Sequence, residues 1–131
     1  MAATVRVLVG TRKGVFILES EAARTDWRLR GPFCETWPIH HVMADSETGA
    51  IHAAGGSPWF GPAVWTSRDA GETWSHSREG LAYDAGEDPV QAVWSLARGP
   101  QGLYAGVEPA GLFFRRGGGG GLSGGRGALP F

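Results

Sequence analysis

The chain lacks most features that mark secreted, membrane or nucleic-acid-binding proteins. It has one cysteine, Cys34, among 131 residues, so no intrachain disulfide can form. No apolar run approaches the ~20 residues that span a bilayer, and the N-terminus lacks the basic segment of a signal peptide. The formal net charge of −1 gives no bulk attraction to nucleic acids or anionic membranes. We therefore expect a cytoplasmic protein with no nucleic-acid partner and no membrane partner.

Glycine and tryptophan, in contrast, are plentiful: the chain has 22 Gly and 6 Trp. Because glycine adopts the positive φ of tight turns and aromatic rings pack well on pleated surfaces, this composition favours an all-β fold. Short apolar runs bounded by turn residues predict strands, and no window shows helical periodicity of useful length. The predicted strands are residues 5–10, 14–19, 27–31, 39–44, 50–54, 63–67, 73–77, 90–97, 102–106 and 112–115.

An internal repeat is the most informative pattern. In three segments a strand ends at a small residue, a turn follows, and the next strand carries an aromatic residue: Phe16, Trp65 or Phe113, spaced 49 and 48 residues apart. A period of about 45–50 residues is typical of one four-stranded propeller blade. We predict that residues 1–116 form a partial β-propeller of about two to three antiparallel four-stranded blades. The repeats cover about residues 4–32, 37–80 and 90–116.

The C-terminal tail differs from the repeats. Eight of residues 117–131 are glycine, with Leu, Arg and other residues scattered among them, and they show no strand alternation. We expect this low-complexity tail to be disordered and to belong to no blade. The repeat pattern fails within a residue or two of Arg116, from which we infer that the reading frame or gene model departs from the ancestral one there.

A complete Asp box lies between two predicted strands of the second repeat. It consists of Ser67, Asp69, Gly71, Thr73 and Trp74, in the form Ser-x-Asp-x-Gly-x-Thr-Trp. In such a hairpin the carboxylate accepts hydrogen bonds from backbone N–H groups, and the glycine takes a positive φ. The hydroxyl groups add further hydrogen bonds. The indole is expected to bury its ring against the sheet. The position of the motif between two strands of a repeat is strong support for a propeller blade.

Several segments together resemble a bacterial group of Asp-box (BNR-repeat) β-propellers, which are commonly labelled sialidase-like, exo-α-sialidase or glycosyl hydrolase. They are the Asp box and residues 7–16, 31–33, 37–42, 59–62 and 103–113. The resemblance covers residues from about 4 to 116. It implies a multi-bladed propeller, related in architecture to sortilin-type and YVTN-type propellers, of which this chain would be a truncated N-terminal fragment.

The resemblance leaves three interpretations of function. A sialidase-like glycoside hydrolase needs clustered arginines, a tyrosine nucleophile and acidic partners, but the Arg-Ile-Pro signature is absent and neither Tyr83 nor Tyr104 has a recognisable partner pattern. We predict no catalytic residue. The favoured interpretation is a non-catalytic scaffold that binds an unknown ligand or protein at the propeller axis. The third is a fragment without a function of its own, which self-associates through unpaired blades.

Five residues are candidates for facing a ligand, although solvated turns or packed side chains would explain each of them too: Arg12, Lys13, His41, Trp59 and Glu108. The adjacent His40 and His41 should point to opposite faces of a strand and cannot chelate one metal. We therefore predict no metal site and no cofactor, and we expect Trp65 and Trp94 to lie in the core.

Overall fold

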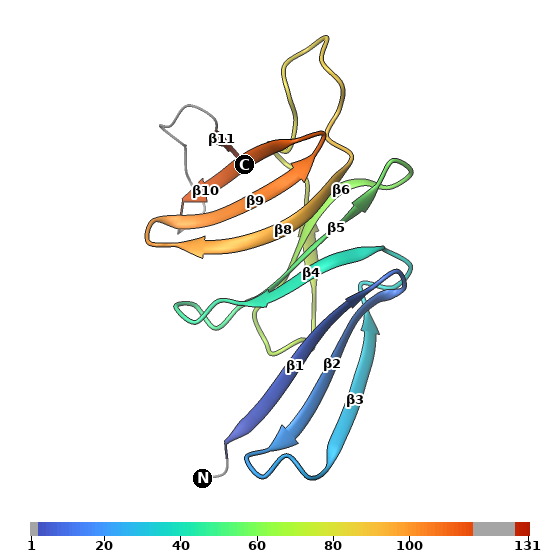
Figure 1. Ribbon diagram of the computed structural model, residues 1–131, viewed down its shortest axis with the longest axis vertical. Coiled ribbons are helices and arrows are strands. Elements are labelled where there is room, and N and C mark those ends of the chain that lie inside the picture. Colours follow the sequence, from blue (N-terminus) through green and yellow to red (C-terminus); the bar gives the residue numbers. More distant parts are fainter. Residues whose placement is uncertain (1–2, 117–127) are drawn as a thin grey trace.

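Figure 1 shows the computed structural model, which describes residues 3–116 and 128–131. The regular elements of this part are all β-strands, which confirms the predicted all-β class. The strands are β1 (Thr4–Thr11), β2 (Gly14–Glu21), β3 (Trp27–Phe33), β4 (Ile39–Ala44), β5 (Ile51–Ser57), β6 (Gly61–Ser67), β7 (Ser75–Ser77), β8 (Ala92–Gly99), β9 (Gly102–Glu108), β10 (Gly111–Arg116) and β11 (Ala128–Pro130).

The strands form three groups that follow one another along the chain and along the long axis of the molecule (Figure 1). The N-terminal group, β1 to β3, is a separate antiparallel sheet. The middle group, β4 to β7, and the C-terminal group, β8 to β11, belong to one curled eight-stranded sheet. Strand pairing between these two groups consists of a single residue pair, Gly56 of β5 and Ala92 of β8. Each group is therefore built mainly from consecutive strands.

All ten predicted strands are present, with shifted ends. The largest shift is at β5, which ends at Ser57 and not at residue 54. Two strands start two residues late: β7 begins at Ser75 and not at residue 73, and β8 begins at Ala92 and not at residue 90. Thr73 cannot begin the strand because its backbone N–H is bonded to the Asp69 carboxylate in the preceding turn. Strand existence was thus predictable from alternation, whereas strand ends depend on turn hydrogen bonds.

The prediction that the tail belongs to no strand group is wrong at its far end. β11 pairs in parallel with β10, and the N–H of Phe131 donates to the carbonyl of Phe114 at 3.0 Å. The outer edge of β10 offers unpaired backbone groups that an extended segment can bind. The ring of Phe131 also meets Phe113 edge to face, with centroids 6.5 Å apart. The predicted disorder of residues 117–127 lies outside the described residues.

Each group has two faces because side chains alternate along its strands. We call the face toward the preceding group the leading face, and the face toward the next group the trailing face. Val15 and Ile17, on the trailing face of the N-terminal group, are fully buried. They pack with Ile51 and Ala53, on the leading face of the middle group. This contact forms the first of two hydrophobic cores.

The second core repeats the same relation one group later. Ala54 and Val64 lie on the trailing face of the middle group, and they pack with Val93 and Phe113 on the leading face of the C-terminal group. The strands pack in the same order too, since β4 lies against β1 as β8 lies against β5. The chain therefore stacks its groups by one repeated trailing-to-leading contact.

Candidate functional site

The Asp-box residues form a dense hydrogen-bonded turn between β6 and β7. The Asp69 carboxylate accepts from the Thr73 backbone N–H at 2.8 Å, from the Thr73 hydroxyl at 2.6 Å and from the Ser67 hydroxyl at 2.9 Å. The Ser67 oxygen in turn accepts the N–H of Gly71 at 2.8 Å, and the Trp74 indole donates to the Gly71 carbonyl at 2.9 Å. Hydrogen bonds, first of all from the Thr73 hydroxyl and backbone, lower the pKa of Asp69 to about 2.

This turn also docks on the N-terminal group. Gly71 has a φ of +93°, and a Cβ added there would lie 2.8 Å from Cδ1 of Ile17. Arg30 of β3 reaches across and donates to the Ala70 carbonyl at 3.0 Å. Its other terminal nitrogen pairs with the Glu72 carboxylate at 3.1 Å. The turn therefore closes its own hairpin and fixes the neighbouring strand group at the same time.

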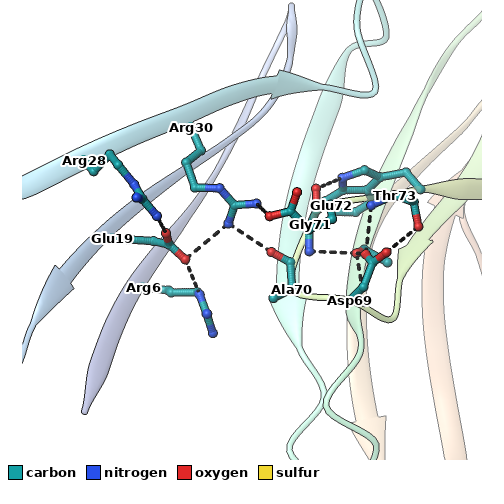
Figure 2. A network of polar contacts seen from close by, with 11 residues as sticks. Arg6, Glu19, Arg28, Arg30, Asp69, Ala70, Gly71, Glu72 and Thr73 are labelled. Carbon is teal, nitrogen blue, oxygen red and sulfur yellow. Dashed lines mark hydrogen bonds and ion pairs between the residues drawn. The ribbon is translucent and has the colours of Figure 1, made fainter. Parts of the chain in front are cut away.

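A cluster of three arginines around Glu19 extends this contact, as Figure 2 shows. The Glu19 carboxylate binds Arg6 at 2.7 Å, Arg28 at 2.6 Å and Arg30 at 3.2 Å. Hydrogen bonds from Arg6 and Arg28 lower the pKa of Glu19 to about 2 against the opposing effect of burial, and its side chain is only 11% exposed. The cluster borders a groove of about 600 Å³ between this sheet and the Asp-box turn. The three guanidinium groups already hold one carboxylate of the chain itself.

This cluster was not predicted from the sequence. Arg28 and Arg30 alternate along one strand opposite Glu19, and that spacing was visible in the sequence. The contact of Arg30 with Ala70 and Glu72 was not visible, because it joins residues about 40 positions apart through packing of two strand groups.

The turns of three β-hairpins lie along one side of the molecule, toward the right in Figure 1, and four of the predicted ligand-facing residues are on them. Arg12 and Lys13 are exposed in the turn between β1 and β2. Trp59 is 89% exposed in the turn between β5 and β6, and Glu108 is exposed at the end of β9. We call this side the hairpin end.

The expectation that Trp94 lies in the core is wrong, because its side chain is 48% exposed. The register between β8 and β9 shifts between Val93 and Ser95, and the extra residue of this bulge turns the indole away from the core. Trp65, in contrast, packs against the first hydrophobic core as expected. The sequence pattern alone predicts that both indoles are buried, and the bulge in β8 explains why Trp94 is exposed while Trp65 is packed.

Trp94 is held in place by two neighbours that the sequence does not place beside it. Its ring stacks on His40 with centroids 4.0 Å apart, and its indole N–H donates to the Glu108 carboxylate at 3.3 Å. The Nε2 of His40 donates to the Gly56 carbonyl at 2.9 Å, which fixes that ring in turn. We call Trp94, His40 and Glu108 the Trp94 platform. It joins β4, β8 and β9 into one fixed surface at the hairpin end.

His41, another predicted ligand-facing residue, points elsewhere. Its Nδ1 accepts the backbone N–H of Leu96 at 3.0 Å, so the ring connects β4 to β8 and occupies one of its nitrogens in doing so. The predicted strand alternation is interrupted here, because the register of β4 against β5 shifts between Ile39 and His41. Both histidines contact β8, His40 through the ring of Trp94 and His41 through the N–H of Leu96.

The two tyrosines considered as nucleophiles have structural contacts. The Tyr83 hydroxyl donates to the Pro109 carbonyl at 2.7 Å, and burial raises the pKa of Tyr83. The ring of Tyr104 packs on Phe114 with centroids 4.7 Å apart. A raised pKa opposes formation of a phenolate nucleophile, and neither contact activates a tyrosine.

Comparison with known proteins adds no family assignment. No protein-family model matches the chain, and no curated protein matches it either. Among residues 3–116 and 128–131, no group of three or more potential metal ligands comes together. The described part of the chain also has no helix of the length and apolarity needed to cross a membrane.

Proposed function

We propose that the three strand groups are blades of an Asp-box β-propeller and that the chain is a non-catalytic binding scaffold. Two observations support the blades: the repeated trailing-to-leading packing, and an Asp-box turn whose bonds also dock it on the neighbouring group. Propellers present turns and inner strands at one end of the ring, where ligands and partners bind. The hairpin end is the corresponding surface in this chain.

The observation that carries the binding function is the Trp94 platform. An indole that is 48% exposed yet stacked on His40 and bonded to Glu108 is a rigid apolar surface beside a carboxylate. Rigid aromatic rings bind at low cost in conformational entropy, and tryptophan is enriched at sites that contribute most to binding. An aromatic plane next to a hydrogen-bonding carboxylate suits the apolar face and hydroxyl groups of a sugar. We therefore propose a carbohydrate ligand.

A sialidase-like glycoside hydrolase is the alternative. One observation favours it: Arg6, Arg28 and Arg30 converge on one carboxylate, as a clamp for an acidic sugar would. The carboxylate in that position belongs to Glu19, however, and a substrate would have to displace a group held by three ion pairs. The raised pKa of Tyr83 also weighs against a tyrosine nucleophile. We therefore favour ligand binding at the Trp94 platform over glycoside hydrolysis.

The test is a glycan array of neutral and sialylated oligosaccharides, probed with the full chain, with affinities then measured by calorimetry. We expect Trp94→Ala to weaken binding of the retained glycans at least ten-fold, or about 1.4 kcal/mol, and Glu108→Gln to weaken it less. Trp27→Ala is the matched control, since Trp27 is 43% exposed but lies on the N-terminal group. It should leave affinity unchanged.

Two outcomes would contradict the scaffold. Glycan binding that survives Trp94→Ala would move the site away from the platform. Hydrolysis of a fluorogenic sialoside by the wild-type chain, lost in Arg28→Ala, would establish the hydrolase alternative instead.

A further inference from the structure

The leading face of the N-terminal group is apolar and uncovered by the rest of the described chain. Val7 is 43% exposed, Trp27 43% and Leu29 61%. The strand register places Val7 opposite Leu18 and Leu18 opposite Leu29, so that one apolar row crosses the whole sheet. Exposed apolar residues that cluster in this way on a soluble protein mark a surface that binds another surface.

The corresponding faces of the other two groups are covered. Phe16 lies on this open face, at the position that Trp65 occupies in the middle group and Phe113 in the C-terminal group. Trp65 packs in the first hydrophobic core, beneath the trailing face of the N-terminal group. Phe113 is fully buried beneath the trailing face of the middle group. In both contacts between strand groups, a leading face therefore packs on a trailing face.

One trailing face has no following group in the described chain, that of the C-terminal group. Leu112 lies on it, 40% exposed and opposite Gly106, and beside it are Tyr104, which is half-buried, and Phe114, which is buried. Ser95 on β8 adds a small exposed side chain opposite Gly106. Small residues beside larger apolar ones leave room for the protruding side chains of a leading face.

We propose that the open leading face of one copy packs on the open trailing face of a second copy. The contact would continue, between molecules, the packing that already joins the groups within one molecule. It joins two different surfaces, so it is head-to-tail, and repetition of it yields a closed ring or a filament. The proposal rests on how the strand groups pack and is independent of what the Trp94 platform binds.

The test is sedimentation velocity of the full chain across a range of concentrations, with two variants that each block one face. We expect the wild type to associate beyond the dimer. Leu29→Glu, on the leading face, and Leu112→Glu, on the trailing face, should each be monomeric alone. Both side chains are well exposed, so the variants should keep the wild-type circular dichroism spectrum. Trp59→Glu, at a position 89% exposed on the hairpin end, is the control and should associate like the wild type.

Mixing the two variants distinguishes this arrangement from others. Leu29→Glu copies keep an intact trailing face and Leu112→Glu copies keep an intact leading face, so an equimolar mixture should form dimers and nothing larger. A wild-type chain that stays monomeric at high micromolar concentration would overturn the proposal. Loss of association in Leu29→Glu but not in Leu112→Glu would also overturn it, because it would show contact between two like faces.

Discussion

The N-terminal and C-terminal strand groups carry the same aromatic position in very different surroundings. Phe113 in the C-terminal group is fully buried, while Phe16 in the N-terminal group lies on a face that no other group of residues 3–116 and 128–131 covers. The local structure is the same in both, since each residue follows a hairpin and is paired across an antiparallel strand. The repeat therefore sets where the side chain points, and the neighbouring group sets how much free energy its burial contributes.

The largest effect should come from truncating these two rings. Phe113→Ala removes a fully buried ring and leaves a cavity, which costs about 3–5 kcal/mol of unfolding free energy. Phe16→Ala removes a ring that is already partly in contact with water, and should cost about 1 kcal/mol. Urea unfolding of the two variants, followed by circular dichroism, measures the difference.

The measurement should be made at low protein concentration, so that association does not stabilise the open face. Equal losses for Phe16→Ala and Phe113→Ala would mean that the leading face of the N-terminal group is covered after all. In that case the difference between the two ends of the molecule would disappear.

The same comparison shows what could be predicted from the sequence. The ten strands and the Asp-box turn were predictable, because alternation and turn chemistry are local. Exposure was not, because Phe16 and Phe113 look alike in the sequence and differ only in which group lies next to them. Trp94 was misplaced for a related reason: one bulge residue turns it outward, and no local pattern marks that bulge.

The candidate site was predictable in part for the same reason. Trp59 and Glu108 could be proposed from their loops, whereas His40 and Trp94 come together only when β4 and β8 become neighbours. The contact of Arg30 with the Asp-box turn likewise needs two groups to be packed. The site residues that could not be predicted from the sequence are therefore those that come together only when the strand groups pack.

The next effect separates two roles of glycine in the contact between the N-terminal and middle groups. Gly71 and Gly86 have nearly equal φ values, +93° and +92°, so alanine at either position carries the same backbone strain of about 1–2 kcal/mol. Only at Gly71 would the added Cβ also press on Ile17, at 2.8 Å, since nothing lies within 4 Å of it at Gly86. We expect Gly71→Ala to destabilise the chain by about 1–3 kcal/mol more than Gly86→Ala does.

Thermal or urea unfolding of the two glycine variants measures this excess. If Gly71→Ala and Gly86→Ala lower stability equally, the Asp-box turn does not press against Ile17. The turn would then close its own hairpin without fixing the N-terminal group.

The smallest effect is a pH dependence of the N-terminal strand group. The folded pKa of Glu19 is about 2, against 4.5 for the free side chain. A carboxyl group with a lowered folded pKa stabilises the fold above its unfolded pKa, and this contribution is lost as the pH falls from about 4.5 toward 2. Hydrogen exchange measured by mass spectrometry should therefore show β1 to β3 losing protection in this range before β8 to β10.

Glu21 and Asp69, whose pKa values are also about 2, titrate in the same range, so a variant is needed to assign the effect. Glu19→Gln removes the charge that holds Arg6, Arg28 and Arg30. This variant should show lower protection of β1 to β3 at neutral pH, and that protection should depend less on pH in acid than it does in the wild type. Added salt should reduce the acid-induced loss of protection in the wild type, because it screens the more exposed arginines. If all three strand groups lost protection together in acid, in wild type and variant alike, the ion pairs at Glu19 would have no separate role. The N-terminal group would then unfold only as part of the whole molecule, and its contact with the Asp-box turn would be as strong as the contact that buries Phe113.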